Sequence, residues 1–194
     1  MVLEGQAVRL SQSTADDAEE LLASLDQEAA WQYLPFRAAS PAEMREQLVQ
    51  RLGDPSWHCW TVRLREPRHG LPAGAVVGTT SYLDTHVESA RTEIGATQYS
   101  PSVWGTRVNP ECKLALLSYA FDELHMGRVQ VKTDVRNVRS QQAIARLGAK
   151  YEGVLRRYQR RADGSVRDTV LFSIIAEDWP DVRARLEQRL SQAQ

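Results

Sequence analysis

Residues 101–121, PSVWGTRVNPECKLALLSYAF, place a Trp-Gly turn directly before an amphipathic helix. Asn109 suits the N-cap and Pro110 the first helical position. Apolar side chains then recur on one helix face at Leu114, Leu117, Phe121 and Leu124. Backbone N–H groups before a helix N-terminus, together with the positive end of the helix dipole, form an anion site. The stretch therefore predicts a phosphate-binding loop, and a plain turn that leads into a packed helix is the alternative.

Composition indicates an ordinary soluble globule, which we expect to be a single domain spanning residues 1–194. The 194 residues are 42% hydrophobic and 25% charged, which is enough to bury a core. Lys and Arg number 24 against 25 Asp and Glu, so a formal net charge of −1 gives no overall attraction to nucleic acid or an anionic membrane. Cys59 and Cys112 lack metal-type spacing, and no apolar run approaches a membrane span. The sequence therefore predicts a cytoplasmic protein without a metal site.

Hydrophobic periodicity predicts a mixed α/β fold. Strands are expected at residues 6–10, 57–65, 74–83, 91–99, 128–134, 149–161 and 167–176. Helices are expected at residues 14–25, at 40–52 with Ser40 as the N-cap, at 109–124, at 137–147 with Gly148 as the stop, and near the carboxyl terminus. Asp163-Gly164 suits the turn of the last hairpin. This order differs from a regular doubly wound sheet, and the sequence contains no Rossmann, Walker or nucleophile-elbow motif.

Three stretches together resemble the GNAT acyltransferases of the RimJ/RimL type, the ribosomal-protein N-acetyltransferase branch. They are EIGATQYSPSVWGTRVNPECKLALLSYAF (93–121), NVRSQQAIARLGAKYEGVLRR (137–157) and DGSVRDTVLFSIIAEDW (163–179). AAWQYLPF (29–36) and VVGTTSYLD (76–84) extend the resemblance over nearly the whole chain. The resemblance implies a mixed sheet in which two central parallel strands, Arg91–Tyr99 and Arg128–Asp134, splay apart. It also implies that acetyl-CoA is the co-substrate, with its pantetheine arm in the gap and its pyrophosphate at the helix start.

The resemblance assigns cofactor binding to the loop and to the start of the next helix. The residues are Trp104, Gly105, Thr106, Arg107, Val108, Asn109, Asn137 and Ser140. Two small residues of the family's loop pattern are replaced here, by Arg107 and Asn109. Backbone N–H donors still serve phosphate if the loop avoids left-handed dihedrals. The guanidinium of Arg107 either meets a CoA phosphate or blocks its approach.

Acetyl transfer to an amine requires a base for the amine's proton and benefits from a proton donor to the departing thiolate. Many relatives use a helix tyrosine as donor, but Ile144 stands at that position. Ser140 of the N-x-x-S motif is the replacement candidate, and a polar residue in the first turn of a helix capped by Asn137 is the alternative. Glu93 is the candidate base, with a strand glutamate paired to an arginine as the alternative. Cys112 is interpreted as structural.

The protein is therefore expected to be an acetyl-CoA-dependent N-acetyltransferase. Its acceptor is expected to be a primary amine, either a protein N-terminal α-amine or a small-molecule amine. Trp31, Tyr33 and Tyr82 are the candidate substrate-binding aromatics. One alternative is a CoA-binding module with weakened catalysis, because the loop glycine and the helix tyrosine are both replaced. A weaker alternative is ribosome or RNA binding through the arginines of residues 156–161. A homodimer is a further expectation.

Overall fold

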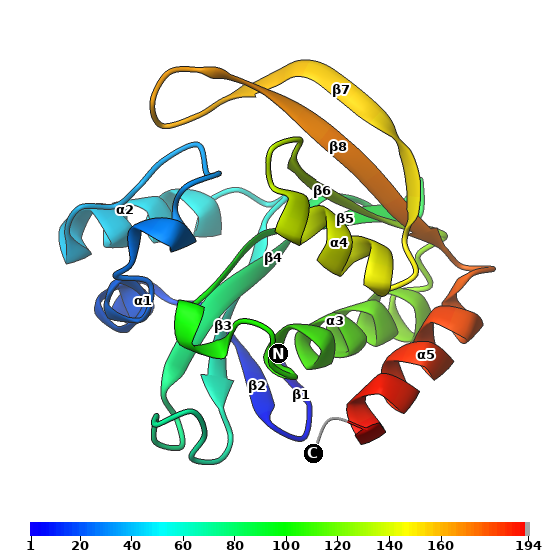
Figure 1. The fold of residues 1–194 in the computed structure, drawn as a ribbon, viewed down its shortest axis with the longest axis horizontal. Helices are drawn as coiled ribbons and strands as arrows, with labels where there is room; N and C mark the ends of the chain where they lie inside the picture. Colours follow the sequence, from blue (N-terminus) through cyan, green and yellow to red (C-terminus); the bar gives the residue numbers. More distant parts are fainter. Residues whose placement is uncertain (193–194) are drawn as a thin grey trace.

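The computed structural model describes residues 1–192, whose strands form a single mixed sheet (Figure 1). The strand order is β1-β2-β3-β4-β5-β6-β8-β7. The strands are β1 (Val2–Glu4), β2 (Val8–Gln12), β3 (His58–Leu64), β4 (Val76–His86), β5 (Arg91–Tyr99), β6 (Arg128–Asp134), β7 (Lys150–Arg160) and β8 (Val166–Ile175). Neighbouring strands are antiparallel except for β5 and β6, which are parallel. The mixed α/β prediction is confirmed.

The helices are α1 (Ala18–Ser24), α2 (Pro41–Leu52), α3 (Val108–Ser118), α4 (Val138–Arg146) and α5 (Trp179–Gln192). Figure 1 shows α1 beside α2, and α3 packed along α5 at the opposite side of the molecule. The predicted cap of α2 is confirmed, since the Ser40 hydroxyl accepts a hydrogen bond from the Glu43 N–H. Gly148 ends α4 with a φ of 95°, a left-handed conformation that suits glycine.

The central strands β5 and β6 part after a short pairing. Their register runs only from Arg91↔Arg128 to Glu93↔Gln130, although both strands continue. Beyond this point β5 contains a bulge at Ala96, whose φ is 46°, where its pairing with β4 shifts register. A bulge bends its strand and increases the local twist. The predicted splay is therefore present, and it opens immediately after Glu93.

Two hydrophobic clusters stabilise the packing of the helices against the sheet and against each other. The larger one joins the sheet to α3, α4 and α5, with Ile94 and Val129 from the central strands fully covered. The smaller one lies between α1, α2 and the segment that contains Trp31. Burial of this apolar surface is the main stabilising contribution to both layers. The parted strands are therefore anchored in the larger cluster.

Three expected boundaries differ from the structure. A strand was expected only at residues 6–10, but the structure has β1 and β2, which pair with each other. The helix of the quoted stretch begins at Val108, so Asn109 and Pro110 lie inside α3 and Arg107 takes the N-cap position. α3 then passes into a π-helical segment at Tyr119–Glu123 instead of continuing regularly. Pro110 is tolerated because the N–H groups of a first helical turn have no partner within the helix.

Candidate active site

A cavity of about 650 Å³ occupies the space between the parted strands. Its walls come from β5, β6, the loop before α3 and the start of α4. Its wall includes Gly105 and Asn109 at the start of α3 and, from the segment between α1 and α2, Tyr33 and Phe36. A pocket of this size is typical of a small-molecule site, and about half of the residues in its wall are polar or charged.

The loop before α3 is held in its conformation by local hydrogen bonds. The Trp104 Nε1–H donates to the Tyr99 carbonyl at 2.9 Å, and the Thr106 hydroxyl donates to the Val103 carbonyl at 2.7 Å. Gly105 has a φ of 76°, and an added Cβ would meet nothing within 4 Å, so the backbone conformation and not space favours glycine. Arg107 has a φ of −70°, which explains how a residue other than glycine fits there.

Six of the eight predicted cofactor residues line the cavity, and two do not. Trp104, Gly105, Thr106, Asn109, Asn137 and Ser140 are in its wall. Val108 is completely buried in the core instead. Arg107 turns toward Glu111, with 2.5 Å between Nε and Oε1, and also donates to the Gln6 side chain. The guanidinium of Arg107 therefore holds the start of α3 and is directed away from the cavity, while cofactor binding by the backbone N–H groups of this loop stays a prediction.

Arg139 is a cavity cation that the sequence did not single out. Its guanidinium lies 3.3 Å from the centre of the Trp104 ring and joins α4 to the loop before α3. Such stacking of a planar guanidinium on an aromatic face is favourable. Burial lowers the pKa of Arg139, with a small opposing effect of Tyr33. A positive charge therefore lies at the end of the cavity where the anion site was predicted.

The start of α4 is organised by Asn137. Its side-chain oxygen accepts a hydrogen bond from the Ser140 N–H at 3.0 Å, as expected for an N-cap. This bond uses the backbone of Ser140 and leaves its hydroxyl out of the cap. Ser140 lines the cavity one helical turn before Ile144. The structure thus places the Ser140 side chain at the cavity while Asn137 carries the capping role.

Glu93 lies at the point where the strands part, and only 6% of it is exposed. Lys132 Nζ is 2.7 Å from Oε2, and the Gln130 side chain donates to the same oxygen at 3.3 Å. An added Cβ at Gly95 would lie 2.9 Å from Oε1, so glycine leaves room for this carboxylate. Burial favours the neutral form of Lys132, but Glu93 and Tyr158 outweigh it and raise the lysine's pKa. The cation partner of Glu93 is therefore Lys132, where the alternative to the catalytic assignment had an arginine.

Lys113 is a second cation that sequence reasoning missed. It is 4% exposed, lines the cavity and donates to the Thr97 hydroxyl at 3.2 Å. Burial lowers its pKa to about 8, although the neighbouring Cys112 opposes this. Lys113 follows Asn109 by four residues, which puts both on one helix face, so this spacing was a usable signal. Burial raises the pKa of Cys112 to about 12, which agrees with a structural thiol.

Of the three aromatic residues predicted to bind the substrate, one lies in the cavity wall and two are buried in the core. Tyr33 lines the cavity, whereas Trp31 is 4% exposed and donates its Nε1–H to the Leu25 carbonyl. Tyr82 is 1% exposed, packs against Trp60 and donates its hydroxyl to the Leu116 carbonyl. Trp31 and Tyr82 are therefore core residues, because each ring finds both apolar neighbours and a buried acceptor. The cavity wall also includes Phe36, Arg51, Trp57, Asp84, Tyr158 and Arg167.

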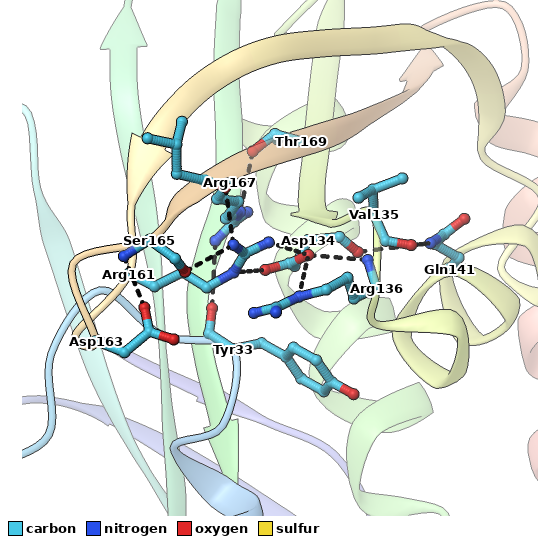
Figure 2. A network of polar contacts seen from close by, with 11 residues as sticks. Tyr33, Asp134, Val135, Arg136, Gln141, Arg161, Asp163, Ser165, Arg167 and Thr169 are labelled. Atoms are coloured by element: carbon cyan, nitrogen blue, oxygen red, sulfur yellow. Dashed lines mark hydrogen bonds and ion pairs between the residues drawn. The ribbon is translucent and has the colours of Figure 1, made fainter.

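The β7–β8 hairpin is attached to β6 by a buried ion pair (Figure 2). Arg161 Nε and Nη2 contact the two oxygens of Asp134 at 2.6 and 3.0 Å, and Arg161 is 8% exposed. Arg161 also donates to the hairpin's own Ser165 and Val166. Figure 2 shows Arg167 next to this pair, with its Nε directed to the Thr169 hydroxyl. Arg161, the most buried arginine of the hairpin, therefore has a structural role.

Among residues 1–192, no group of three or more His, Cys, Asp or Glu side chains is arranged to hold a metal ion. The described part of the chain also contains no helix that is both long and apolar enough to cross a membrane.

Parted parallel strands, a cavity between them and a helix N-terminus at one end define an acyltransferase type of site. The Acetyltransferase (GNAT) domain matches residues 7–150, and the chain belongs to this family. A crystal structure described as an acetyltransferase from T. thermophilus is 37% identical, with a TM-score of 0.86 over 97% of this chain and 96% of that one. The protein is thus an acyltransferase enzyme.

Two further comparisons are more distant. The chain is 29% identical to the uncharacterized N-acetyltransferase p20 of Bacillus licheniformis, over 54% of this chain and only 57% of that protein. A structure described as a ribosomal-protein-serine acetyltransferase from Vibrio cholerae has a TM-score of 0.77 and 21% identity, covering 90% of this chain and 97% of that one. At that identity the likeness shows the fold alone.

Proposed function

We propose that the protein transfers the acetyl group of acetyl-CoA to a primary amine by direct transfer in a ternary complex. The observation that carries this proposal is the parting of β5 and β6 immediately after the Glu93↔Gln130 pair, with one cavity reaching both ends of the gap. Acetyl-CoA enters from the side of α3, and the amine enters from the side of Tyr33 and Phe36. The two substrates meet beside Glu93.

The residues at the α3 end suit the phosphates of CoA. Gly105, Thr106 and Asn109 line the cavity where the N-terminus of an 11-residue helix points, which favours an anion. The guanidinium of Arg139 adds a fixed positive charge there. The altered loop keeps the backbone needed for this role, since Arg107 adopts a right-handed conformation. These features support retained CoA binding.

The reaction then needs one base and one donor. The amine nitrogen attacks the thioester carbonyl carbon, the new C–N bond forms, and the C–S bond breaks. Glu93 takes the proton that the amine loses. The Ser140 hydroxyl gives a proton to the departing thiolate and recovers one from solvent. No covalent enzyme intermediate is involved, in agreement with the buried Cys112, whose raised pKa makes it a poor nucleophile.

A direct assay tests this function. The protein is mixed with acetyl-CoA and a panel of peptide N-termini and small amines, and thiol release is measured together with acetylated product. Calorimetry with CoA runs in parallel. Acceptor-dependent thiol release supports the proposal, whereas CoA binding without turnover would favour the binding-module alternative. Salt-sensitive retention of RNA without turnover would favour the third alternative.

The finer assignments are part of the same proposal. The RimJ/RimL-type stretches favour a protein N-terminal α-amine as one acceptor class. Cys59 and Cys112 are both free and buried, which suits a reducing compartment such as the cytoplasm. The homodimer and the single-domain organisation stay predictions, and a sedimentation experiment together with limited proteolysis tests them.

A further inference from the structure

The acceptor end of the cavity contains carboxylates that already have cation partners. Asp84 lies 2.6 Å from Arg91, Glu93 lies 2.7 Å from Lys132, and Asp134 is held by Arg161. Each of these carboxylates lines the cavity. Their negative charges are therefore largely neutralised within the protein before any acceptor enters.

Two cavity arginines are in the opposite situation. Within residues 1–192, the ion pairs of the structure include neither Arg51 nor Arg167. Arg167 donates to the Thr169 hydroxyl at 3.0 Å and, weakly, to the Tyr33 carbonyl at 3.5 Å, both of which are neutral. Arg51 lies over the rings of Phe36 and Trp57, at 4.7 and 5.4 Å from their centres. Both guanidinium groups thus keep unused capacity for an anion.

Both arginines are also partly removed from water. Burial lowers the pKa of Arg51 and of Arg167. For Arg167 the neighbouring Arg161 acts in the same direction, and Asp134, Glu93 and Tyr158 oppose the shift only in part. A buried cation without an anion is costly, so such groups are usually paired when their site is filled. A guanidinium presents a planar fork of N–H donors that matches the geometry of a carboxylate.

We propose that the acceptor carries a carboxylate near its reacting amine, and that Arg167, with Arg51 beside the aromatic wall, binds this carboxylate. Arg167 comes from β8 and Arg51 from α2, so the acceptor lies between the hairpin and the α1–α2 layer (Figure 1). This inference rests on the proposed function and adds the chemical class of the acceptor. The carboxylate comes either from a free amino acid or from an acidic side chain close to a peptide N-terminus.

Two matched pairs of acceptors separate these sources. Alanine and alaninamide differ in the α-carboxylate, and Ala-Asp-Ala-amide and Ala-Asn-Ala-amide differ in one side-chain carboxylate. For each pair we take the ratio of kcat/KM, acidic over neutral, in the natural protein and divide it by the same ratio in Arg167→Gln. Differences in amine basicity cancel in this quotient. We expect a quotient of about 10–100 for one pair, the effect of one charge-assisted hydrogen bond.

The matched control is Arg156→Gln, which makes the same change at an exposed arginine of the hairpin that does not line the cavity. Its quotient should be near one. Arg51→Gln should lower the preference in the same direction as Arg167→Gln, and it keeps the test decisive if Arg167→Gln does not fold, as judged by thermal melting and CoA binding. A quotient near one for both pairs in both variants would overturn the inference.

The two proposals fail in different ways. If the natural protein acetylates amines but treats both members of each pair alike, the carboxylate inference is wrong and the acetyltransferase function stands. If no amine in either pair or in the broader panel is acetylated while CoA binds, the proposed function itself is wrong.

Discussion

Lys132 and Glu93 face each other across the opening between β6 and β5, with 2.7 Å between Nζ and Oε2. Lys132 also donates to the Tyr158 hydroxyl at 2.7 Å, which links the pair to the β7–β8 hairpin. The carboxylate proposed to accept the amine's proton therefore has a lysine as its direct partner, in a position that is nearly closed to water.

Replacing Glu93 by Gln should lower kcat by about 10²–10⁴-fold, the usual contribution of general acid–base catalysis. Gln keeps the shape and a hydrogen bond to Lys132 but cannot take a proton. The loss should be greatest at low pH, where the amine is most fully protonated, and should shrink as pH rises. The pH–rate profiles of the variant and the natural protein measure this. Full activity with an unaltered profile would remove Glu93 from the mechanism.

Glu152→Gln is the matched control for this experiment. Glu152 pairs with Arg128 outside the cavity, and its hydrogen bonds with Arg128 help to lower its pKa to about 2, which makes it a poor base. Its replacement should leave kcat nearly unchanged. A large loss in Glu152→Gln would show that the Glu93 effect reflects general disturbance of the sheet.

Lys132→Met should lower kcat and leave the dissociation constant of acetyl-CoA nearly unchanged. The variant removes the ion pair that fixes the Glu93 side chain where the strands part, while Met keeps the length and the apolar part of the side chain. Single-turnover kinetics and calorimetry measure the two quantities. Full activity in Lys132→Met would show that the Lys132–Glu93 pair is not needed to position the base.

Ser140→Ala should lower turnover while the dissociation constant of acetyl-CoA changes little. The capping bond to Asn137 uses the Ser140 N–H, so Ala keeps the start of α4 intact. Asn137→Ala is the contrasting variant, which removes the cap and should lower the unfolding free energy by about 1 kcal/mol. Single-turnover kinetics and calorimetry separate the two effects. Equal losses of rate and affinity in Ser140→Ala would assign it a structural role only.

Arg107→Ala should lower the unfolding free energy by about 3 kcal/mol, the lower end for a buried pair that loses one partner. Glu111 is left buried, although it still accepts a hydrogen bond from the Ala7 N–H at 2.8 Å. Acetyl-CoA affinity should change little, because the Arg107 side chain lies outside the cavity wall. Chemical denaturation and calorimetry measure both quantities. A strong loss of affinity with unchanged stability would restore Arg107 as a phosphate contact.

The sequence predicted the parts of the fold that depend on local patterning. The Ser40 cap, the end of α4 at Gly148 and the hairpin turn at Asp163-Gly164 all follow from single residues whose backbone preference is strong. The splay of β5 and β6 came from the family resemblance, since no local pattern specifies where two strands stop pairing.

Side-chain direction was the part that sequence could not provide. Trp31 and Tyr82 were expected at the acceptor, but a ring enters a pocket or the core according to which neighbours reach it, and these are distant in sequence. The Arg107 side chain similarly donates a hydrogen bond to Gln6, which is 101 residues away in the sequence. Arg51 and Arg167 became candidates only when the structure showed that nearby carboxylates were already paired.

Lys113 gives the last prediction, which concerns the pH dependence of stability. Burial lowers its pKa from an ordinary value of 10.5 to about 8, so between these values the unfolded chain binds more protons than the folded one. The contribution of Lys113 to the unfolding free energy therefore rises with pH from about 8 to about 10.5, and its full destabilising effect is present below pH 8.

Lys113→Met should accordingly be more stable than the natural protein at pH 7, by about 3 kcal/mol. The buried Cys112 has a raised pKa of about 12 and lowers stability as pH rises above 9, and Lys113 itself opposes the rise of this pKa, so the thiol contributes differently in the two proteins above pH 9. The difference between their unfolding free energies, measured by urea denaturation from pH 6.5 to 9, therefore isolates the lysine. This difference in unfolding free energy should be constant below about pH 7.5 and should decline above it. A difference that does not change with pH would show that Lys113 is charged to the same extent in the folded and unfolded chains.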